Sequence, residues 1–306
     1  MSIPSESPKL RRSFGLFSAT MLGTGAIIGA GIFVLSGIAA GEAGPALLLA
    51  FALNGLAALV IGACYAELAS AMPRAGGSYY WIKQGIGSRA AFFAGWICFY
   101  ADTVAAALYA KAFGSFAIAL AGPLVPSSWI TTSVQTTLIA IVVIGFVTLI
   151  EFRGAKETVV TENIIAGLKI ALLMVFVVVG AAVLIQGPES PTALSPFMPN
   201  GVGGLVIAMV LTFVAFEGFE VITRSGEEVR NPTVNIPQAV FASILISIFL
   251  YLAVALITLL AVQPPLGQAG YEYLGSLGEL GMARVAGQIM PHGQSLFYIA
   301  GMASRS

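Results

Sequence analysis

The chain has 306 residues, of which 58% are hydrophobic and only 9% are charged. Soluble domains carry about 25% charged residues, so this composition excludes a water-soluble protein of this size. Fourteen basic residues balance fourteen acidic ones, and the two cysteines and single histidine are too few for a disulfide framework or a zinc site. The sequence therefore predicts an all-α integral membrane protein that contacts lipids and has no nucleic-acid partner and no metal.

Long apolar stretches follow one another along most of the chain. A helix needs about 20 apolar residues to cross roughly 30 Å of hydrocarbon. On this basis we predict seven spans, at residues 14–40, 45–70, 90–121, 130–150, 159–185, 203–224 and 237–262. We expect residues 263–290 to form a long loop that carries a surface helix. An eighth span begins near residue 292 and reaches only Ser306.

Basic residues are confined to alternate loops. Ten of the fourteen Lys and Arg residues lie in the N-terminal segment or between spans 2 and 3, 4 and 5, and 6 and 7. The opposite loops before residue 263 contain none. Because cytoplasmic loops carry the excess of Lys and Arg, the pattern predicts a multi-pass protein of the cell membrane. Its N-terminus is cytoplasmic, and residues 122–129 and 186–202 lie outside.

The first span contains the glycine-rich stretch GAIIGAGIF at residues 25–33. Each glycine costs about 1 kcal/mol of helix propensity relative to alanine. For Gly25 and Gly29 alone, a small-residue packing face is an equally good interpretation, because small residues let membrane helices approach closely.

The sixth span contains FVAFEGFE at residues 213–220, which places Glu217, Gly218 and Glu220 at membrane depth. A charge there costs at least about 2.5 kcal/mol and normally lines a cavity. Interrupted helices at corresponding places in two halves of a chain are typical of inverted-repeat transporters with a binding site at the membrane midplane.

Interrupted helices also indicate the chemistry of the ligand. They expose backbone N–H groups at the N-terminus of one half-helix and backbone carbonyls at the C-terminus of the other. The N–H groups suit a carboxylate and the carbonyls suit an ammonium group. An α-amino acid presents both groups, so we expect an amino acid substrate.

Three motifs taken together resemble those of the amino acid–polyamine–organocation permeases. GAIIGAGIF is similar to their first-helix signature, and ELASAMPRAGGSYYW (67–81) to their motif between helices 2 and 3. FEGFE with EEVRNPTVNIP (227–237) is similar to their helix 6 and the loop after it. The resemblance implies a leucine-transporter-type fold of inverted five-helix repeats, with helices 1 and 6 broken, that carries amino acids by alternating access.

The resemblance also implies a division of the chain. Residues 1–13 would be a cytoplasmic N-terminal segment, and residues 14–185 the first five-helix repeat. Residues 186–306 would be an incomplete second repeat that holds helices 6, 7 and the start of helix 8, without helices 8–10.

The binding residues of the family transfer to these motifs position by position. The resemblance implies that a substrate carboxylate binds the backbone amides of Gly29, Ala30 and Gly31. It implies that a substrate ammonium group binds the backbone carbonyls of Ile27, Val214, Ala215 and Glu217. Ala30 replaces a hydroxyl residue of many relatives, which removes a side-chain donor and leaves the amide.

Three further side chains are candidates for the site. Lys169 lies about ten residues into the fifth span, near the midplane. The resemblance implies that its ammonium stands where a sodium ion sits in other members, with the proton as coupling ion and no other cofactor; a structural ion pair is the alternative. Asp102 is a substrate contact, a proton site or a structural hydrogen-bonding residue. Phe216 either covers the substrate or is an ordinary packing residue.

We therefore predict a secondary active transporter of amino acids, working as a proton-coupled symporter. The alternatives are an exchanger of amino acids or amines, and an inactive fragment without helices 8–10. A membrane enzyme is disfavoured, because the sequence shows no nucleophile–base set and no metal cluster. The sequence leaves open which amino acid is carried and what the oligomeric state is.

Overall fold

The structure is a computed structural model that describes residue 12 and residues 14–74, 76–121, 133–152, 159–186 and 194–303. Helices dominate these ranges, and the one extended pairing within them is an isolated parallel bridge between Phe14 and Val229. The predicted outer segment 122–129 lies outside the described residues, as do most of residues 1–13 and residues 187–193 of the predicted outer segment 186–202.

The seven predicted spans coincide with helices. The first is split into α1 (Leu16–Ile27) and α2 (Gly31–Ala43), and the sixth into α8 (Gly201–Phe213), a 3₁₀ turn η4 (Val214–Phe216) and α9 (Glu220–Arg224). The other five are α3 (Leu47–Ala71), α5 (Ser88–Ala121), α6 (Ser133–Phe152), α7 (Val159–Gln186) and α10 (Pro232–Ala261). A 3₁₀ turn η1 (Gly44–Ala46) joins α2 to α3, and a short helix α4 (Gly77–Gly85) precedes α5. Five helical stretches of the described chain are long and apolar enough to cross a membrane, and α1 and Val134–Leu149 are shorter apolar helices.

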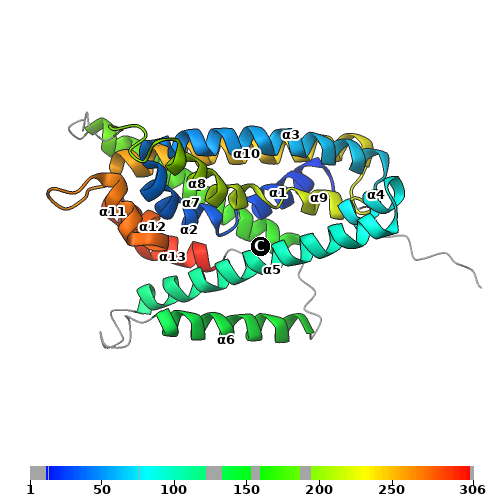
Figure 1. The fold of residues 1–306 in the computed structure, drawn as a ribbon, viewed down its shortest axis with the longest axis horizontal. Coiled ribbons are helices and arrows are strands. Elements are labelled where there is room, and N and C mark those ends of the chain that lie inside the picture. The colour runs from blue at the N-terminus through cyan, green and yellow to red at the C-terminus, as the bar shows by residue number, and fades with distance from the viewer. Residues whose placement is uncertain are drawn as a thin grey trace, which may run out of the picture.

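The helices run mostly along one long axis (Figure 1). α3 and α10 lie side by side and pack closely, because α3 presents glycines to isoleucines of α10: Gly55 meets Ile248 and Gly62 meets Ile244. The two split helices lie below this pair, with α1 and α9 toward the α4 end and α2 and α8 toward the opposite end. The long helix α5 crosses beneath them and packs against α6.

The expectation of a long loop that carries a surface helix at residues 263–290 is wrong in the length of the loop, which covers only residues 263–269. The rest of the segment forms α11 (Gly270–Leu277), a 3₁₀ turn η5 (Gly278–Leu280) and α12 (Gly281–Ile289), all packed against α2. The reason is contact between glycines on both sides. A Cβ atom added at Gly275 would lie 2.8 Å from the Cα of Gly41, and one added at Gly281 would lie 3.1 Å from the Cα of Gly37.

The predicted start of an eighth span is a helix, α13 (Gly293–Met302). It begins after His292, which adopts a left-handed conformation with φ 57° at the N-cap. Phe297 of α13 packs edge-on against Phe33 of α2, with ring centroids 5.6 Å apart. The C-terminal helices therefore gather around α2 at one end of the molecule (Figure 1).

The first residues of the described chain are fixed to the segment between α9 and α10. The Phe14 amide donates to the Glu228 carbonyl at 3.0 Å, and the Arg230 amide donates to the Phe14 carbonyl at 2.8 Å. Phe14 and Val229 are both buried. The start of α1 is thereby joined directly to the chain that leaves α9.

Candidate functional site

The first helix break spans residues 28–30, between α1 and α2. Ile28 still donates its amide to Thr24 at 2.8 Å, but its ψ of 57° turns the chain out of the helix. The Gly29 amide then donates to the Ile27 carbonyl at 2.7 Å in a tight turn. The helical pattern resumes when the Val34 amide donates to the Ala30 carbonyl at 3.0 Å.

The second break follows η4. Glu217 is extended, with φ −66° and ψ 151°, and Gly218 has φ 123°, a conformation that glycine adopts without steric cost. The Glu217 amide donates to the Val214 carbonyl at 3.2 Å. The Gly218 amide donates to the Glu220 carboxylate at 3.0 Å, so this carboxylate binds the start of its own half-helix.

The two breaks touch each other through glycine. A Cβ atom at Gly218 would lie 2.6 Å from the carbonyl carbon of Ala26, and one at Gly31 would lie 2.9 Å from the Cα of Ala215. Backbone thus meets backbone at both contacts. This close approach brings the start of α2, with its unpaired first amides, beside the end of α8 and η4 with its carbonyls.

The residues predicted to bind the carboxylate, Gly29, Ala30 and Gly31, all lie in the first break. They are not equivalent. The Gly29 amide is already used within the turn, whereas Ala30 and Gly31 are the N-cap and first residue of α2, where no preceding helical turn supplies an acceptor. Gly31 packs on Ala215, so a larger side chain there would displace protein backbone as well as a ligand.

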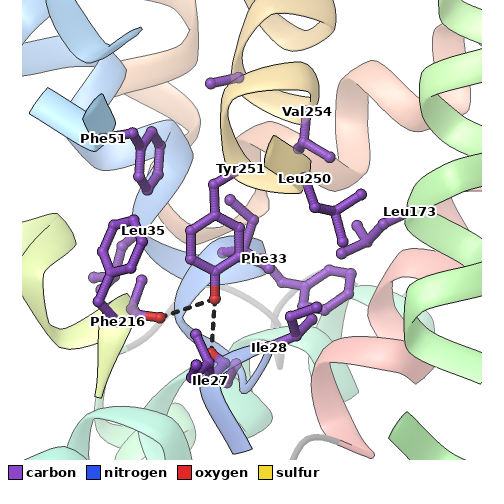
Figure 2. Packing of buried hydrophobic residues seen from close by; sticks show 14 of the residues in the cluster. Ile27, Ile28, Phe33, Leu35, Phe51, Leu173, Phe216, Leu250, Tyr251 and Val254 are labelled. Atoms are coloured by element: carbon purple, nitrogen blue, oxygen red, sulfur yellow. Dashed lines mark hydrogen bonds between the residues drawn. The ribbon is translucent and has the colours of Figure 1, made fainter. Parts of the chain in front are cut away.

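Two of the carbonyls predicted to bind the ammonium group share one side-chain donor. The Tyr251 hydroxyl of α10 lies 2.7 Å from the Ile27 carbonyl oxygen and 2.8 Å from the Ala215 carbonyl oxygen (Figure 2). A phenol has a single hydrogen, so it can satisfy only one of these acceptors at a time. An ammonium group has three hydrogens and could satisfy both.

Sequence reasoning missed Tyr251. Its side chain is fully buried and contacts Phe51 and Phe216, with ring centroids 5.5 and 5.2 Å apart (Figure 2). The available signal was a hydroxyl in the middle of the apolar span 237–262, where a buried polar group needs a partner.

Phe216, the predicted substrate cover, is 1% exposed and packs between Phe51 and Tyr251. Through these contacts the Phe216 ring forms part of the buried core behind the second break. They fix η4 against α3 and α10.

Lys169 projects from α7 into the first break. Its side chain is 4% exposed, and Nζ donates to the Ile28 carbonyl at 2.7 Å and to the Gly25 carbonyl at 3.2 Å. Within the described ranges no carboxylate lies at ion-pair distance from it. The ammonium therefore binds carbonyls at the C-terminal end of α1, where the helix dipole favours a cation.

The ion-pair contact of Asp102 is not with a helix break but with Arg224, the last residue of α9. Its carboxylate is 4.0 Å from the guanidinium of Arg224, and both side chains are about half exposed or more, at 63% and 49%. An exposed ion pair of this kind contributes about 0–1 kcal/mol. Of the carboxyl groups of Asp102, Glu217 and Glu220, that of Glu220 contacts the second break itself, through the Gly218 amide.

No cluster of three or more His, Cys, Asp or Glu side chains that could hold a metal ion occurs in the described part of the chain. The groups that meet at the two breaks are backbone amides, backbone carbonyls and a few polar side chains.

Comparison with known proteins finds similarity to membrane transporters. A family model described as amino acid permease matches residues 14–302. The chain is 35% identical over 266 residues to the methylthioribose transporter of Bacillus subtilis, covering 84% of this chain and 57% of that protein. It is 36% identical over 263 residues to the branched-chain amino acid permease BcaP of the same organism, covering 83% and 56%.

A plant protein is similar at lower identity. The chloroplastic cationic amino acid transporter 9 of Arabidopsis thaliana is 28% identical over 296 residues, which cover 89% of this chain and 51% of that protein. The chain thus spans a little over half the length of these relatives.

Proposed function

The chain belongs to the amino acid permease family, and from this premise we propose that its protein carries amino acids across the cell membrane by alternating access. The observation that supports this most directly is the contact between the two helix breaks. Their opposed backbone groups form a site with amides on one side and carbonyls on the other. The names of the relatives give different cargoes: methylthioribose, branched-chain amino acids and cationic amino acids.

The site suits the part of the substrate that all α-amino acids share. The start of α2, at Ala30 and Gly31, would receive the carboxylate, and the carbonyls of Ile27 and Ala215 would receive the ammonium group. Val214 and Glu217 would contribute carbonyls from the second break. On binding, the ammonium would replace the Tyr251 hydroxyl as donor to at least one carbonyl.

Lys169 would couple transport to protons. Its charged ammonium joins α7 to the end of α1 through two carbonyls. Loss of a proton would remove that charge and weaken the contact between the helices. The protonation state of Lys169 would thus set how firmly α1 is attached to α7. Such a group is suited to link the proton gradient to the opening of the site.

Uptake by the full-length gene product in proteoliposomes tests both parts of the proposal. We expect accumulation of at least one of the twenty L-amino acids when an inward pH gradient is imposed, with no requirement for sodium. Lys169→Ala should abolish the gradient-driven accumulation. Lys111→Ala, which removes an exposed lysine of α5, should leave it unchanged.

The outcomes separate the two claims. Absence of uptake for every amino acid would refute amino acid transport. Proton coupling through Lys169 would be refuted, and amino acid transport would not, by either of two results. One is uptake that requires sodium, and the other is a Lys169→Ala variant that still concentrates substrate along a pH gradient.

A further inference from the structure

Asn54 on α3 is a buried amide whose role the site described above does not include. Its side chain is 3% exposed. Nδ2 donates one hydrogen bond to the Met209 carbonyl at 2.8 Å and another to the Thr212 hydroxyl at 2.9 Å. Thr212 is also fully buried, and its hydroxyl donates to the Ala208 carbonyl at 2.7 Å. Both amide hydrogens of Asn54 are thus committed to α8.

Helix association alone does not explain this amide. α3 and α8 already pack through apolar and small side chains, and a hydrogen bond between membrane helices adds only about 0.6 kcal/mol on average. Burying an unbonded amide would cost more than that. What the two directed bonds add is a fixed position of α8 relative to α3.

The bonds are placed at the edge of the second break. Thr212 is followed by Phe213, the last residue of α8, and then by η4 with the Ala215 carbonyl. Tyr251 contacts that carbonyl from α10 at 2.8 Å. Phe51, one turn before Asn54 on α3, packs against Phe216 of η4. Asn54 fixes the α8 side of the break, while Phe51 and Tyr251 fix the η4 side.

We propose that Asn54 is a positioning residue for the substrate's ammonium group. By fixing the end of α8 it holds the carbonyls of Val214 and Ala215 at the spacing and direction that an ammonium group requires. The inference rests on the proposed function. It assigns to Asn54 an effect on the ammonium half of the substrate and none on the carboxylate half, which binds at the start of α2.

The test compares ligands that differ only in the ammonium group. Binding of L-leucine and L-arginine to the purified full-length protein is measured by calorimetry beside binding of their 2-hydroxy acids, which keep the carboxylate and the side chain. Asn54→Leu removes both donors and branches at the same carbon. It should raise the Kd of the amino acids about tenfold, as expected for loss of a buried hydrogen bond, and change the Kd of the hydroxy acids less than about twofold.

Two further variants keep the test decisive. Thr212→Val should shift the same ratio in the same direction, and its effect should not multiply with that of Asn54→Leu, because the two residues share one bond. It also serves if Asn54→Leu does not fold. Thr258→Val is the matched control, since that buried hydroxyl donates only within α10, to the Val254 carbonyl, and the ratio should not change.

Each result has one meaning. Equal losses for amino acids and hydroxy acids, or no loss for either, in both the Asn54 and Thr212 variants would reduce Asn54 to a structural residue. If the Kd of the wild-type protein for the hydroxy acids equals its Kd for the amino acids, the ammonium site itself is refuted. If the wild-type protein binds neither leucine nor arginine nor any other L-amino acid, the proposed function fails, and this inference with it.

Discussion

Single residues from three helices complete the hydrogen bonding around the breaks. Asn54 of α3, Lys169 of α7 and Tyr251 of α10 each donate to backbone or side-chain oxygens of the split helices. A broken helix leaves carbonyls without their usual partners, and a buried carbonyl without a donor costs free energy. These three side chains therefore stabilise a backbone conformation that the split helices could not keep alone.

The hydroxyl of Tyr251 offers the simplest test at this scale. Tyr251→Phe keeps the ring contacts with Phe51 and Phe216 and removes the only hydrogen shared by the Ile27 and Ala215 carbonyls. We expect the free energy of unfolding to fall by about 1–3 kcal/mol, measured as thermal unfolding in detergent. Tyr271→Phe is the control, because its hydroxyl lies in an exposed contact. Equal melting temperatures for the two variants would contradict the bridging role.

Sequence reasoning found one of these three residues. Lys169 was found because a charge at membrane depth is costly and therefore noticeable. Asn54 and Tyr251 were missed, since an uncharged polar residue in a span has many harmless uses. Their importance depends on partners 155 and 224 residues away, which no local pattern displays.

At the scale of elements, the contact between the two breaks depends on glycine. Gly218 has φ 123° and lies against the backbone of Ala26 and Ile27. Gly31 lies against Ala215 in the same way. The half-helices α1 and α9 can therefore approach with no side chain between their ends.

Gly218→Ala should disrupt this contact. A non-glycine residue at this φ costs about 1–3 kcal/mol, and the added Cβ would lie 2.6 Å from a backbone carbon. We expect the free energy of unfolding to fall by roughly 3 kcal/mol or more. Gly203→Ala in α8, where nothing lies within 4 Å of the added Cβ, should be neutral or slightly stabilising. Similar unfolding curves for both variants would contradict the close contact.

Elements were predicted from the sequence better than their packing. Hydropathy located the seven spans. Glycines indicated the first interruption, and Gly218 with Glu217 and Glu220 indicated the second. The same reasoning placed residues 263–290 on the surface, because that segment is short of long apolar runs. Its burial depends on Gly275 and Gly281 facing glycines of α2, a complementarity that is visible only when both helices are in place.

For the whole molecule, the two ends differ in what they carry. One end holds α4, the start of α1 and the chain that leaves α9. The other end holds α11, α12 and α13 (Figure 1). The inverted relation of two repeats remains a prediction, as do the cytoplasmic N-terminus and the division at residues 1–13, 14–185 and 186–306. The charge pattern predicts that the α4 end faces the cytoplasm.

Cysteine labelling tests this orientation. Ile86, at the end of α4, and Leu266, before α11, are both exposed. After Cys64 and Cys98 are replaced by alanine, Leu266→Cys should react with a membrane-impermeant maleimide added to intact cells. Ile86→Cys should react only after permeabilisation. The reverse pattern would invert the topology.

The large sequence separation of the contacts at the first break sets an order of events during synthesis. At 12 residues, α1 is about 18 Å long and cannot by itself span roughly 30 Å of hydrocarbon. Its partners are made much later: Lys169 is 141 residues beyond Ile28, and Tyr251 is 224 residues beyond Ile27. The contacts of the first break therefore cannot be complete until Tyr251 has been made, 224 residues after Ile27.

This delay should be measurable as mechanical tension on the growing chain. In a series of arrest-peptide fusions of increasing length, we expect a pull on the ribosome as α10 reaches the membrane and docks on α1 and α3. Tyr251→Phe should weaken the pull without reducing the apolar character that drives insertion. An unchanged profile would mean that α1 finds its final place before Tyr251 arrives. Before Tyr251 is made, the first broken helix can be held only by contacts with helices that are synthesised earlier, such as the one from Lys169 of α7.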